Sequence, residues 1–392
     1  MGWYPGCFSA DDARLPIPRL QPGSMSQTNP VNAYLEALVG AKGSDLHLNS
    51  GVLPTIRTQG RVVRVRRDEV NHVRELSPEE LRVLILATMP AHLHARWEAE
   101  READYSYDAG AGIGRFRVNA YFDLGGPAAV FRSVPAPPGS MEDVGLPLSV
   151  QALVDQPNGL VMVIGPTGAG KSTTMAALIN EVNSRRPGKI LTIEEPIEFA
   201  YPRDRGCIVS QREVGTDTLS FAAAAKSGLR QDPDVIGVGE IRDADTLMQV
   251  LGLAETGHLV ISTGHGSSVA SGLGRLLGLP EAAREDATRR QLAGVFRAVV
   301  AQALVPRADG EGRLPAFEVL LRTTSTVNKI RDGNLVSLRS DMNERASGMM
   351  TLERSLAELI VRGEVREEDA LLHANDPDQL RSELRSAMAG SA

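Results

Sequence analysis

The stretch that decides the fold is GLVMVIGPTGAGKSTT, residues 159–174. Its apolar run at 160–164 predicts a buried parallel strand. A loop with glycines at three positions follows, and a helical pattern begins at Lys171. This order of strand, glycine loop and helix is the P-loop arrangement, in which backbone N–H groups and a helix N-terminus surround phosphate oxygens. The stretch therefore predicts nucleotide binding.

Each part of this loop has a predicted role. The ammonium group of Lys171 can reach the β- and γ-phosphates of ATP, and the hydroxyl of Ser172 can bind Mg²⁺. A glycine-rich turn with a chance Lys-Ser pair is the alternative, but it does not account for the strand before the loop and the helix after it. The predicted nucleotide-binding residues of the loop are Gly165, Pro166, Thr167, Gly168, Ala169, Gly170, Lys171, Ser172 and Thr173.

The composition bounds the class of protein. The chain has 392 residues, of which 42% are apolar, and a net charge of −7. This length predicts two or three domains, and the acidic balance argues against a broad nucleic-acid surface. Cys7 and Cys207 are isolated, so we predict neither a zinc site nor a disulfide framework. No apolar run is long enough to span a membrane and no secretion signal is visible, so we expect a cytoplasmic protein.

The chain divides into an extension, two domains and a helical end. Residues 1–30, rich in Pro, Gly and Ser, are predicted to be disordered. Residues 31–134 are typical of a small α+β domain, and the PAPPGS sequence marks a linker at 135–144. Residues 145–322 alternate between strand and helix patterns, which indicates an open parallel sheet. Residues 323–392 are predicted to form a helical C-terminal region.

The expected elements follow from local periodicity. In the first domain, strands are expected at 45–48, 55–57, 61–65, 114–122 and 128–132, and helices at 81–89 and 91–99. In the second domain, strands are expected at 160–164, 190–193, 235–238, 259–262 and 315–321, and helices at 171–182, 219–229, 244–254, 270–277 and 286–304. Short helices are expected at 325–330, 352–362, 367–374 and 377–386. Asn32 is predicted to cap a first helix, and Ser77 with Glu80 to form a capping box.

Two carboxylates are predicted to act in nucleotide hydrolysis. The segment DPDVIGVGE is an apolar strand that ends at Glu240, the Walker B arrangement, and we expect Glu240 to order the Mg²⁺ shell and the attacking water. The segment EEPIE, residues 194–198, follows another buried strand, and Glu198 is the predicted water-activating base. The alternatives are a solvated acid for Glu240 and a charged surface turn for residues 194–198.

Two histidines bracket the strand at 259–262. His265 follows the strand, where an imidazole can hydrogen-bond a γ-phosphate and respond to its loss. His258 precedes the strand, and a structural role is an equally good interpretation there.

Three arginines lie in the last strands of the first domain. Arg115 and Arg117 alternate to one face, and Arg132 is in the following strand. In an isolated domain they form a solvated edge. In a ring they could reach the ATP of a neighbouring subunit as arginine fingers.

Together these motifs resemble the secretion and pilus traffic ATPases, and within them the type IV pilus retraction ATPases (the PilT and PilU family, which drives twitching motility). The resemblance covers roughly residues 31–385 in order. The matching segments are residues 44–48, 114–119, 165–174, 191–199, 211–215, 232–243, 254–259 and 298–302.

The resemblance implies a PAS-like N-terminal domain, a RecA-like ATPase domain and a homohexameric ring with ATP between the two domains. In it, Glu240 matches the Walker B glutamate, Glu198 the acidic-box base, and His258 and His265 the histidine box. Arg115, Arg117 and Arg132 fall where the family's first domain supplies arginines across subunit interfaces. The implied partners are an inner-membrane platform protein, at the cytoplasmic face of that membrane, and a paralogous retraction ATPase. Nucleic-acid binding and membrane insertion are not implied.

Several features separate members of this family. The four-cysteine zinc motif usual in assembly-type relatives is absent, which favours the retraction branch over a pilus-assembly or type II secretion ATPase. A late helix needed for retraction aligns degenerately with residues 326–334, and residues 228–231 and 338–342 look closer to the accessory paralogue. Glu195 replaces the usual aspartate, and Gly264 and Gly266 flank His265, which keeps a weakly active accessory ring subunit open. A DNA-translocating motor is the least favoured alternative.

Overall fold

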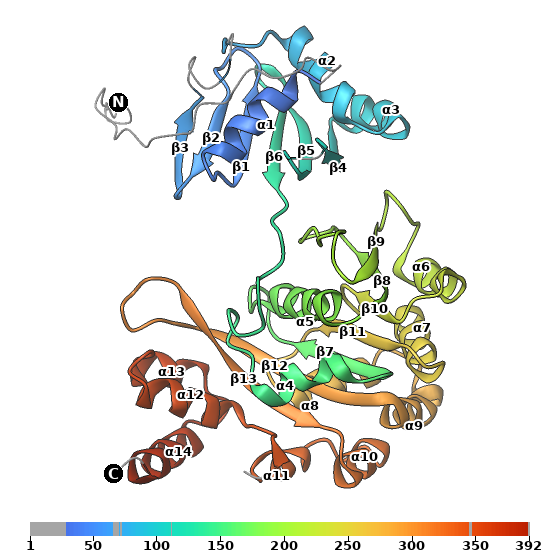
Figure 1. Cartoon of the computed structure of the whole chain (residues 1–392), viewed down its shortest axis with the longest axis vertical. Helices are drawn as coiled ribbons and strands as arrows, with labels where there is room; N and C mark the ends of the chain where they lie inside the picture. The colour runs from blue at the N-terminus through green and yellow to red at the C-terminus, as the bar shows by residue number, and fades with distance from the viewer. Residues whose placement is uncertain (1–28, 66–69, 71–72, 111, 345–346, 391–392) are drawn as a thin grey trace. The chain divides into compact units, whose positions relative to one another are not determined.

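The chain forms two compact units, Met1–Val134 and Pro135–Ala392, which we describe separately (Figure 1). The structure is a computed structural model that describes residues 29–65, 70, 73–110, 112–344 and 347–390. Cys7 and nearly all of the extension predicted at 1–30 lie outside the described residues.

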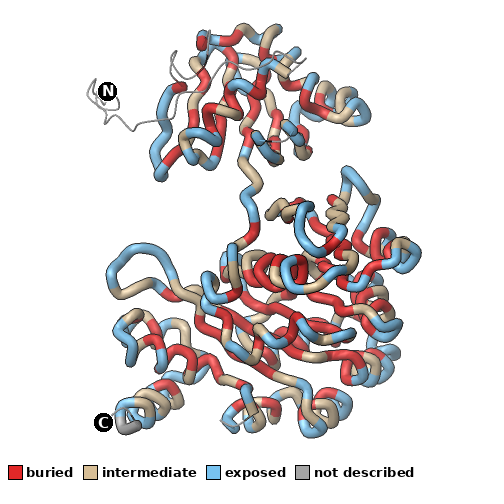
Figure 2. The backbone as a smooth tube through the Cα atoms, in the orientation of Figure 1, coloured by how far each residue is buried: buried red, intermediate tan, exposed pale blue. Residues whose placement is uncertain are grey.

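The first unit is a six-stranded antiparallel sheet with strand order β3-β2-β1-β6-β5-β4. Along β5, Phe116 and Val118 are buried in the apolar core, whereas Arg115 and Arg117 alternate to the opposite face. Figure 2 shows the buried segments along the strands of this unit. The elements are β1 (Asp45–Asn49), β2 (Thr55–Thr58), β3 (Arg61–Arg64), β4 (Glu102–Asp108), β5 (Arg115–Asp123), β6 (Gly126–Ser133), α1 (Val31–Gly40), α2 (Pro78–Thr88) and α3 (Ala91–Glu100).

The first unit confirms the strands predicted at 45–48, 55–57, 114–122 and 128–132, the helices at 81–89 and 91–99 and the capping box, and it differs from expectation at three points. Ser77 and Glu80 form the predicted capping box, with Glu80 N–H donating to Ser77 Oγ over 3.3 Å. Asn32 lies inside α1 instead of capping it, and its amide donates to the carbonyl of Ala109. β3 is a strand but fully exposed, because it is the edge of the sheet. β4 was not predicted, because the charged residues at its ends obscure the alternation of Ala103 and Tyr105.

The second unit is a seven-stranded sheet with order β13-β12-β7-β11-β10-β8-β9, parallel except for the β12–β13 pair. Its strands are β7 (Gly159–Ile164), β8 (Gly188–Glu194), β9 (Cys207–Glu213), β10 (Val235–Val238), β11 (Leu259–Gly264), β12 (Phe296–Pro306) and β13 (Arg313–Leu321). Its helices include α4 (Leu148–Gln151), α5 (Lys171–Arg185), α6 (Phe221–Gly228), α7 (Ala244–Glu255), α8 (Val269–Leu277), α9 (Glu285–Val295), α10 (Thr324–Arg331), α11 (Leu338–Met342), α12 (Leu352–Val361), α13 (Glu367–His373) and α14 (Pro377–Gly390).

Apolar side chains cover both faces of this sheet. Val161 and Val163 of β7 pack toward α5, whereas Leu160 and Met162 of the same strand pack toward the helices α6 to α9. Since β7, β8, β10 and β11 are parallel neighbours, their carboxyl ends meet at one edge, where an open parallel sheet binds its ligand.

The helix predicted at 286–304 is confirmed up to Val295 and wrong beyond it. The helix α9 ends at Val295, and Phe296 starts β12, which pairs with β7 on one side and β13 on the other. A continuous apolar run fits a buried helix and a buried strand equally well, so pairing with distant strands decided the outcome. Strand β9, which pairs with β8, was also not predicted.

The ends of the second unit pack onto its sheet. Residues 135–144, predicted as a linker, contact this unit: Ala200 N–H donates to the carbonyl of Pro135 over 2.9 Å, and Met141 is fully buried. Helices α12 to α14 enclose a small separate core that includes Leu356 and Leu380. Within the described ranges, none of the helices has the length and apolar character needed to cross a bilayer.

Candidate nucleotide-binding site

The P-loop connects the buried strand β7 to the first turn of α5. Gly168 and Gly170 have φ of +76° and +84°, the left-handed region that glycine tolerates best. A Cβ at Gly165 would lie 2.7 Å from the carbonyl oxygen of Gln302, so close packing also requires glycine there. The sequence thus builds a loop whose backbone can line a phosphate.

Lys171 places its charge inside this loop. Its Nζ donates to the carbonyl oxygens of Gly165 and Pro166, both over 3.0 Å. Burial lowers the pKa of the Lys171 ammonium, and the charges of Glu240 and Glu198 oppose that shift. The ammonium therefore faces both a phosphate cradle and two carboxylates.

Gln302 holds the P-loop in place through side-chain hydrogen bonds, a role that the sequence does not indicate. It lies on β12 and is 4% exposed. Its amide donates to the carbonyl of Ala169, and its Oε1 accepts from Thr174 Oγ1 over 2.8 Å. Gln302 thus joins the P-loop to α5. The apolar run at 296–301 fits a helix as well as a strand, so no local signal in the sequence marks Gln302.

Glu240 is the centre of a charged cluster. Its Oε1 lies 2.5 Å from Nε2 of His265, and its Oε2 accepts from Nε of Arg242 over 2.6 Å. Arg242 also donates to Glu195 over 3.1 Å. The cluster joins the ends of β8, β10 and β11. No local pattern marks Arg242 as part of the site, because its contact with Glu195 spans 47 residues.

The acidic segment at the end of β8 begins with a buried glutamate, Glu194, and continues with the exposed glutamates Glu195 and Glu198. Glu194 is 5% exposed and accepts from Thr192 Oγ1 over 2.6 Å and from Gln211 Nε2 over 3.3 Å. Burial raises the pKa of Glu194, although these hydrogen bonds lower it in part. The backbone N–H of Glu198 also donates to Glu194. Glu194 therefore shapes the segment, and Glu198 is exposed.

One cavity of about 280 Å³ brings together the four predicted catalytic residues, Lys171, Glu198, Glu240 and His265. Its lining includes Thr167, Gly168, Lys171, Ser172, Glu194, Glu195, Glu198, Glu240, Arg242, Thr263 and His265. The hydroxyl of Ser172 and the carboxylate of Glu240 bring hard oxygen donors to one cavity, the ligand type that Mg²⁺ prefers. These residues therefore fit a magnesium ion held together with nucleotide phosphates.

The structure does not bring His258 to this cavity. His258 lies before β11, at the opposite end of the strand from His265. Its Nδ1 lies 3.0 Å from the carbonyl oxygen of Leu253 and 3.2 Å from Thr256 Oγ1, contacts that fit the structural alternative.

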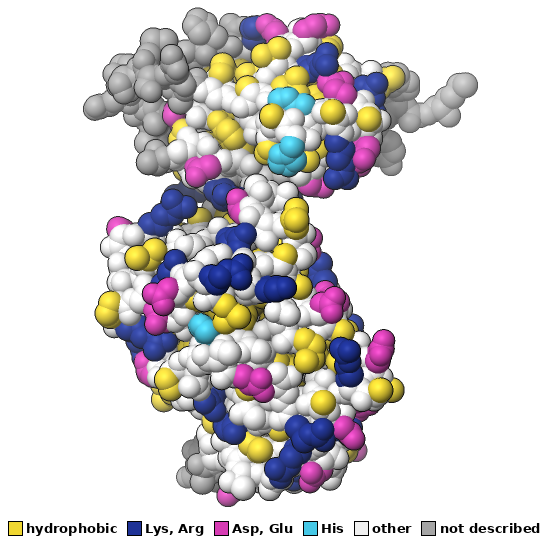
Figure 3. Space-filling model, turned by 90° about the vertical axis from the view of Figure 1, so that its right-hand side faces the viewer, with side chains coloured by type: hydrophobic (Ala, Val, Ile, Leu, Met, Phe, Trp, Pro, Cys, Tyr) yellow, Lys and Arg dark blue, Asp and Glu magenta, His cyan; other side chains and the backbone are white. Residues whose placement is uncertain are grey.

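The three predicted arginines lie in the first unit. Arg117 of β5 is paired with Arg132 of β6, and Arg132 Nε donates to Asp45 over 2.7 Å. Burial alone would raise the pKa of Asp45, but hydrogen bonds from Ser44 and Arg132 outweigh it and lower that pKa. Arg115 begins β5 on the same face. On the face shown in Figure 3, basic and acidic side chains are interspersed in both units.

Gly264 and Gly266 are packed positions. Gly264 pairs with Ile164 inside the sheet, and a Cβ there would meet Met162 Cε at 3.3 Å. A Cβ at Gly266 would lie 2.7 Å from the backbone of Gly272 in α8. The loop that carries His265 therefore touches α8 directly.

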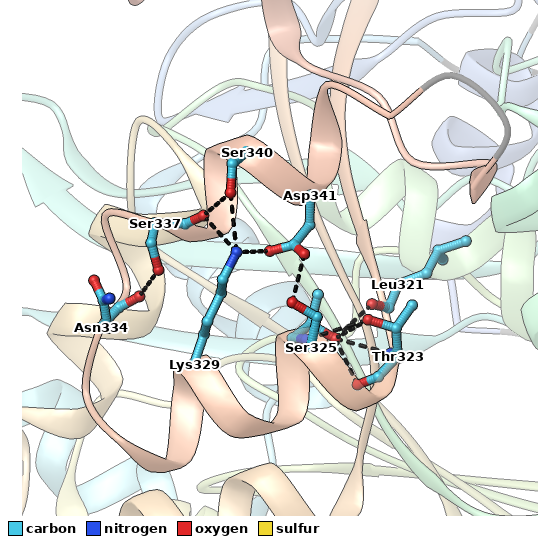
Figure 4. A network of polar contacts seen from close by, with 9 residues as sticks. Leu321, Thr323, Ser325, Lys329, Asn334, Ser337, Ser340 and Asp341 are labelled. Carbon is cyan, nitrogen blue, oxygen red and sulfur yellow. Dashed lines mark hydrogen bonds and ion pairs between the residues drawn. The ribbon is translucent and has the colours of Figure 1, made fainter.

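The segment aligned with the late retraction helix is braced by Lys329 (Figure 4). Lys329 Nζ donates to the carbonyl of Ser337 over 3.0 Å and to Ser340 Oγ over 2.9 Å, and it forms an ion pair with Asp341. Asp341 also accepts from Ser325 Oγ over 2.7 Å. These contacts join α10 to α11.

The parallel sheet, the P-loop and the carboxylates around it define a P-loop NTPase. The model of the family described as Type II/IV secretion system protein matches residues 139–387. The chain belongs to this family.

Relatives over most of the chain are pilus ATPases. The chain is 38% identical to the type IV pilus ATPase PilU of Pseudomonas aeruginosa, over 88% of this chain and 89% of that protein. It is also 38% identical to PilT, the type IV pilus retraction ATPase of the same organism, over 86% and 95%. The crystal structure of the pilus retraction motor PilT with bound ADP matches with a TM-score of 0.80 and 34% identity, over 90% of this chain and 99% of that one. These findings confirm the resemblance inferred from the motifs and the predicted α/β fold class.

Proposed function

We propose that this protein is an ATP-hydrolysing motor that powers type IV pilus retraction and twitching motility. The observation that carries the proposal is one cavity lined by Lys171, Ser172, Glu240 and His265 at the carboxyl edge of the parallel sheet. Similarity to PilT and PilU over most of the chain supports the coupling of hydrolysis to pilus retraction.

The residues divide the chemistry of hydrolysis among them. The P-loop N–H groups and Lys171 hold the phosphates and stabilise negative charge at the γ-phosphoryl group. Ser172 and Glu240 would hold Mg²⁺, which neutralises phosphate charge when bound. Glu198 accepts a proton from the attacking water, whose oxygen bonds to the γ-phosphorus as the bond to the ADP oxygen breaks. His265 adjoins Glu240 and lines the cavity, where its imidazole would hydrogen-bond the γ-phosphate.

Arginines from a neighbouring subunit complete the site in this proposal. Arg115, Arg117 and Arg132 share the polar face of the first-unit sheet, and phosphoryl transfer gains from such charges. A homohexamer would bring that face to the ATP of the next subunit. The ring would act at the cytoplasmic face of the inner membrane on a pilus platform protein. A paralogous retraction ATPase is a further partner.

A second candidate is an accessory ring subunit that works beside a main retraction motor. The chain is 38% identical both to PilU and to PilT, so sequence identity does not separate the main motor from the accessory subunit. In either case ATP binds in the same cavity.

Deletion of the gene in its host tests the proposal. The deletion strain should keep surface pili and lose retraction, which is scored by imaging labelled pili and by twitching zones. Wild-type protein should restore both, and Lys171→Ala should not. Normal retraction in the deletion strain would contradict a motor role, and a partial loss would support the accessory role.

A further inference from the structure

The start of α8 is held by a carboxylate from a distant strand. Glu318 lies on β13, and its Oε2 accepts from the backbone N–H of Val269 over 2.7 Å. Ser268 and Ser271 form the remaining cap at this helix N-terminus. Three residues separate Val269 from His265, so this hydrogen bond fixes the far end of the loop at residues 265–268, the histidine loop.

Glu318 is buried at this position. It is 4% exposed, and a carboxylate loses much hydration there. Burial raises the pKa of Glu318 to about 7, and the hydrogen bond from Val269 lowers it in part. Burying a carboxylate with a single backbone donor costs free energy, so Glu318 is a poor choice for filling the core. A negative charge is favourable at a helix N-terminus, which is where Glu318 accepts its hydrogen bond.

The helix α8 packs closely against residues that adjoin the nucleotide site. A Cβ at Gly272 of α8 would lie 2.4 Å from Ile164, the last residue of β7 before the P-loop. Gly266, beside His265, is packed against the same helix position. A shift of the α8 N-terminus would therefore displace His265, which lies 2.5 Å from Glu240.

Charged groups of the C-terminal helices also act on Glu318. Arg339 of α11 forms an ion pair with Glu353 of α12 over 3.0 Å, and Glu353 is fully buried. The charge of Glu353 raises the pKa of Glu318, and that of Arg339 lowers it. Glu318 thus holds the end of the histidine loop through Val269 and responds to the charges of Arg339 and Glu353.

We propose that Glu318 is a positioning residue for ATP hydrolysis, which holds α8 and thereby sets His265 against Glu240. This role rests on the proposed ATPase activity. Glu318 is not among the residues that line the nucleotide cavity, so its effect is on turnover. Nucleotide binding depends on the P-loop and Lys171, which Glu318 does not contact.

Steady-state ATPase kinetics and titration with a fluorescent ADP analogue test this role in the full chain, well below the melting temperature. Glu318→Leu removes the acceptor and should lower kcat about ten- to hundredfold, the cost of a small misplacement in a site. The KM for ATP and the affinity for the ADP analogue should stay within about twofold. Glu318→Gln keeps an acceptor oxygen and should retain kcat within about threefold.

Val269→Pro tests the same hydrogen bond from the donor side. Proline is tolerated at the first position of a helix, and it removes the N–H donor. It should lower kcat like Glu318→Leu, and the double variant should be no slower than either single variant. If Glu318→Leu does not fold, the role is decided by Val269→Pro and Glu318→Gln alone.

Full kcat in a folded Glu318→Leu or Val269→Pro protein would overturn the positioning role and leave the ATPase assignment intact. An equal loss of kcat and ADP affinity would also overturn it. An inactive wild type would overturn both proposals.

Discussion

Oε1 of Glu240 lies 2.5 Å from Nε2 of His265, across two neighbouring parallel strands. The opposite carboxylate oxygen accepts from Arg242, so both oxygens of Glu240 have a cationic or ionisable neighbour. This arrangement joins the predicted Walker B acid to the predicted γ-phosphate sensor. A change at the γ-phosphate can therefore alter the contacts of Glu240 and, through Arg242, of Glu195.

Glu240→Gln should bind ADP normally and hydrolyse ATP about 10²- to 10³-fold more slowly, because it keeps the shape but removes the charge that orders the metal and water. Turnover and ADP affinity are the measurements. Glu255→Gln, at an exposed end of α7, is the matched control and should be unchanged. Comparable turnover in Glu240→Gln and wild type would exclude Glu240 from the chemistry.

Gln302→Leu should weaken ADP binding about tenfold and destabilise the fold. The change leaves Ala169 O and Thr174 Oγ1 without their buried partner, at a cost of about 1–3 kcal/mol for each group. Thermal melting and ADP titration measure the two effects. Gln291→Leu removes an exposed amide of α9 and serves as the control. An unchanged ADP affinity would show that the P-loop does not depend on Gln302.

Gly266→Ala and Gly264→Ala should differ sharply. A Cβ at Gly266 meets the backbone of Gly272 at 2.7 Å, so α8 must move, with a cost of about 1–3 kcal/mol and a loss of kcat. At Gly264 the nearest atom is the flexible end of Met162 at 3.3 Å, and we expect less than about 1 kcal/mol. Denaturant unfolding with kcat measures both. Equal effects would argue against direct packing between the histidine loop and α8.

Rings that mix Arg117→Ala with Lys171→Ala test whether the arginines act on a neighbour. Each variant alone should be nearly inactive. At equal proportions, independent sites should recover about a quarter of wild-type turnover, because some interfaces pair an intact P-loop with an intact Arg117. Co-expression with two affinity tags isolates mixed rings, and Arg96→Ala on α3 replaces Arg117→Ala in the control. Mixed rings as inactive as the single variants would contradict action across the interface.

The local part of this site could be predicted from sequence, and the long-range part could not. The P-loop, Glu240 and His265 each adjoin a short apolar strand, so one stretch of sequence contains both the strand and its functional residue. Gln302 was hidden because the run from Phe296 is compatible with a helix until its pairing with β7 is known.

Contacts between distant segments explain the other omissions. Glu318 and Val269 are 49 residues apart, and Arg242 and Glu195 are 47 apart. Neither pairing has a local periodicity, because each depends on the order of strands in the sheet. In the first unit, periodicity predicts the strand β3 but does not identify it as the exposed edge strand, because it does not show which strand lacks a neighbour.

The most direct test of the central claim is the steady-state ATPase rate of the purified chain with Mg²⁺, measured together with its mass by light scattering. We predict a hexamer that hydrolyses ATP, and a Lys171→Ala hexamer with no turnover. A wild-type hexamer whose turnover does not exceed that of Lys171→Ala would contradict the motor assignment.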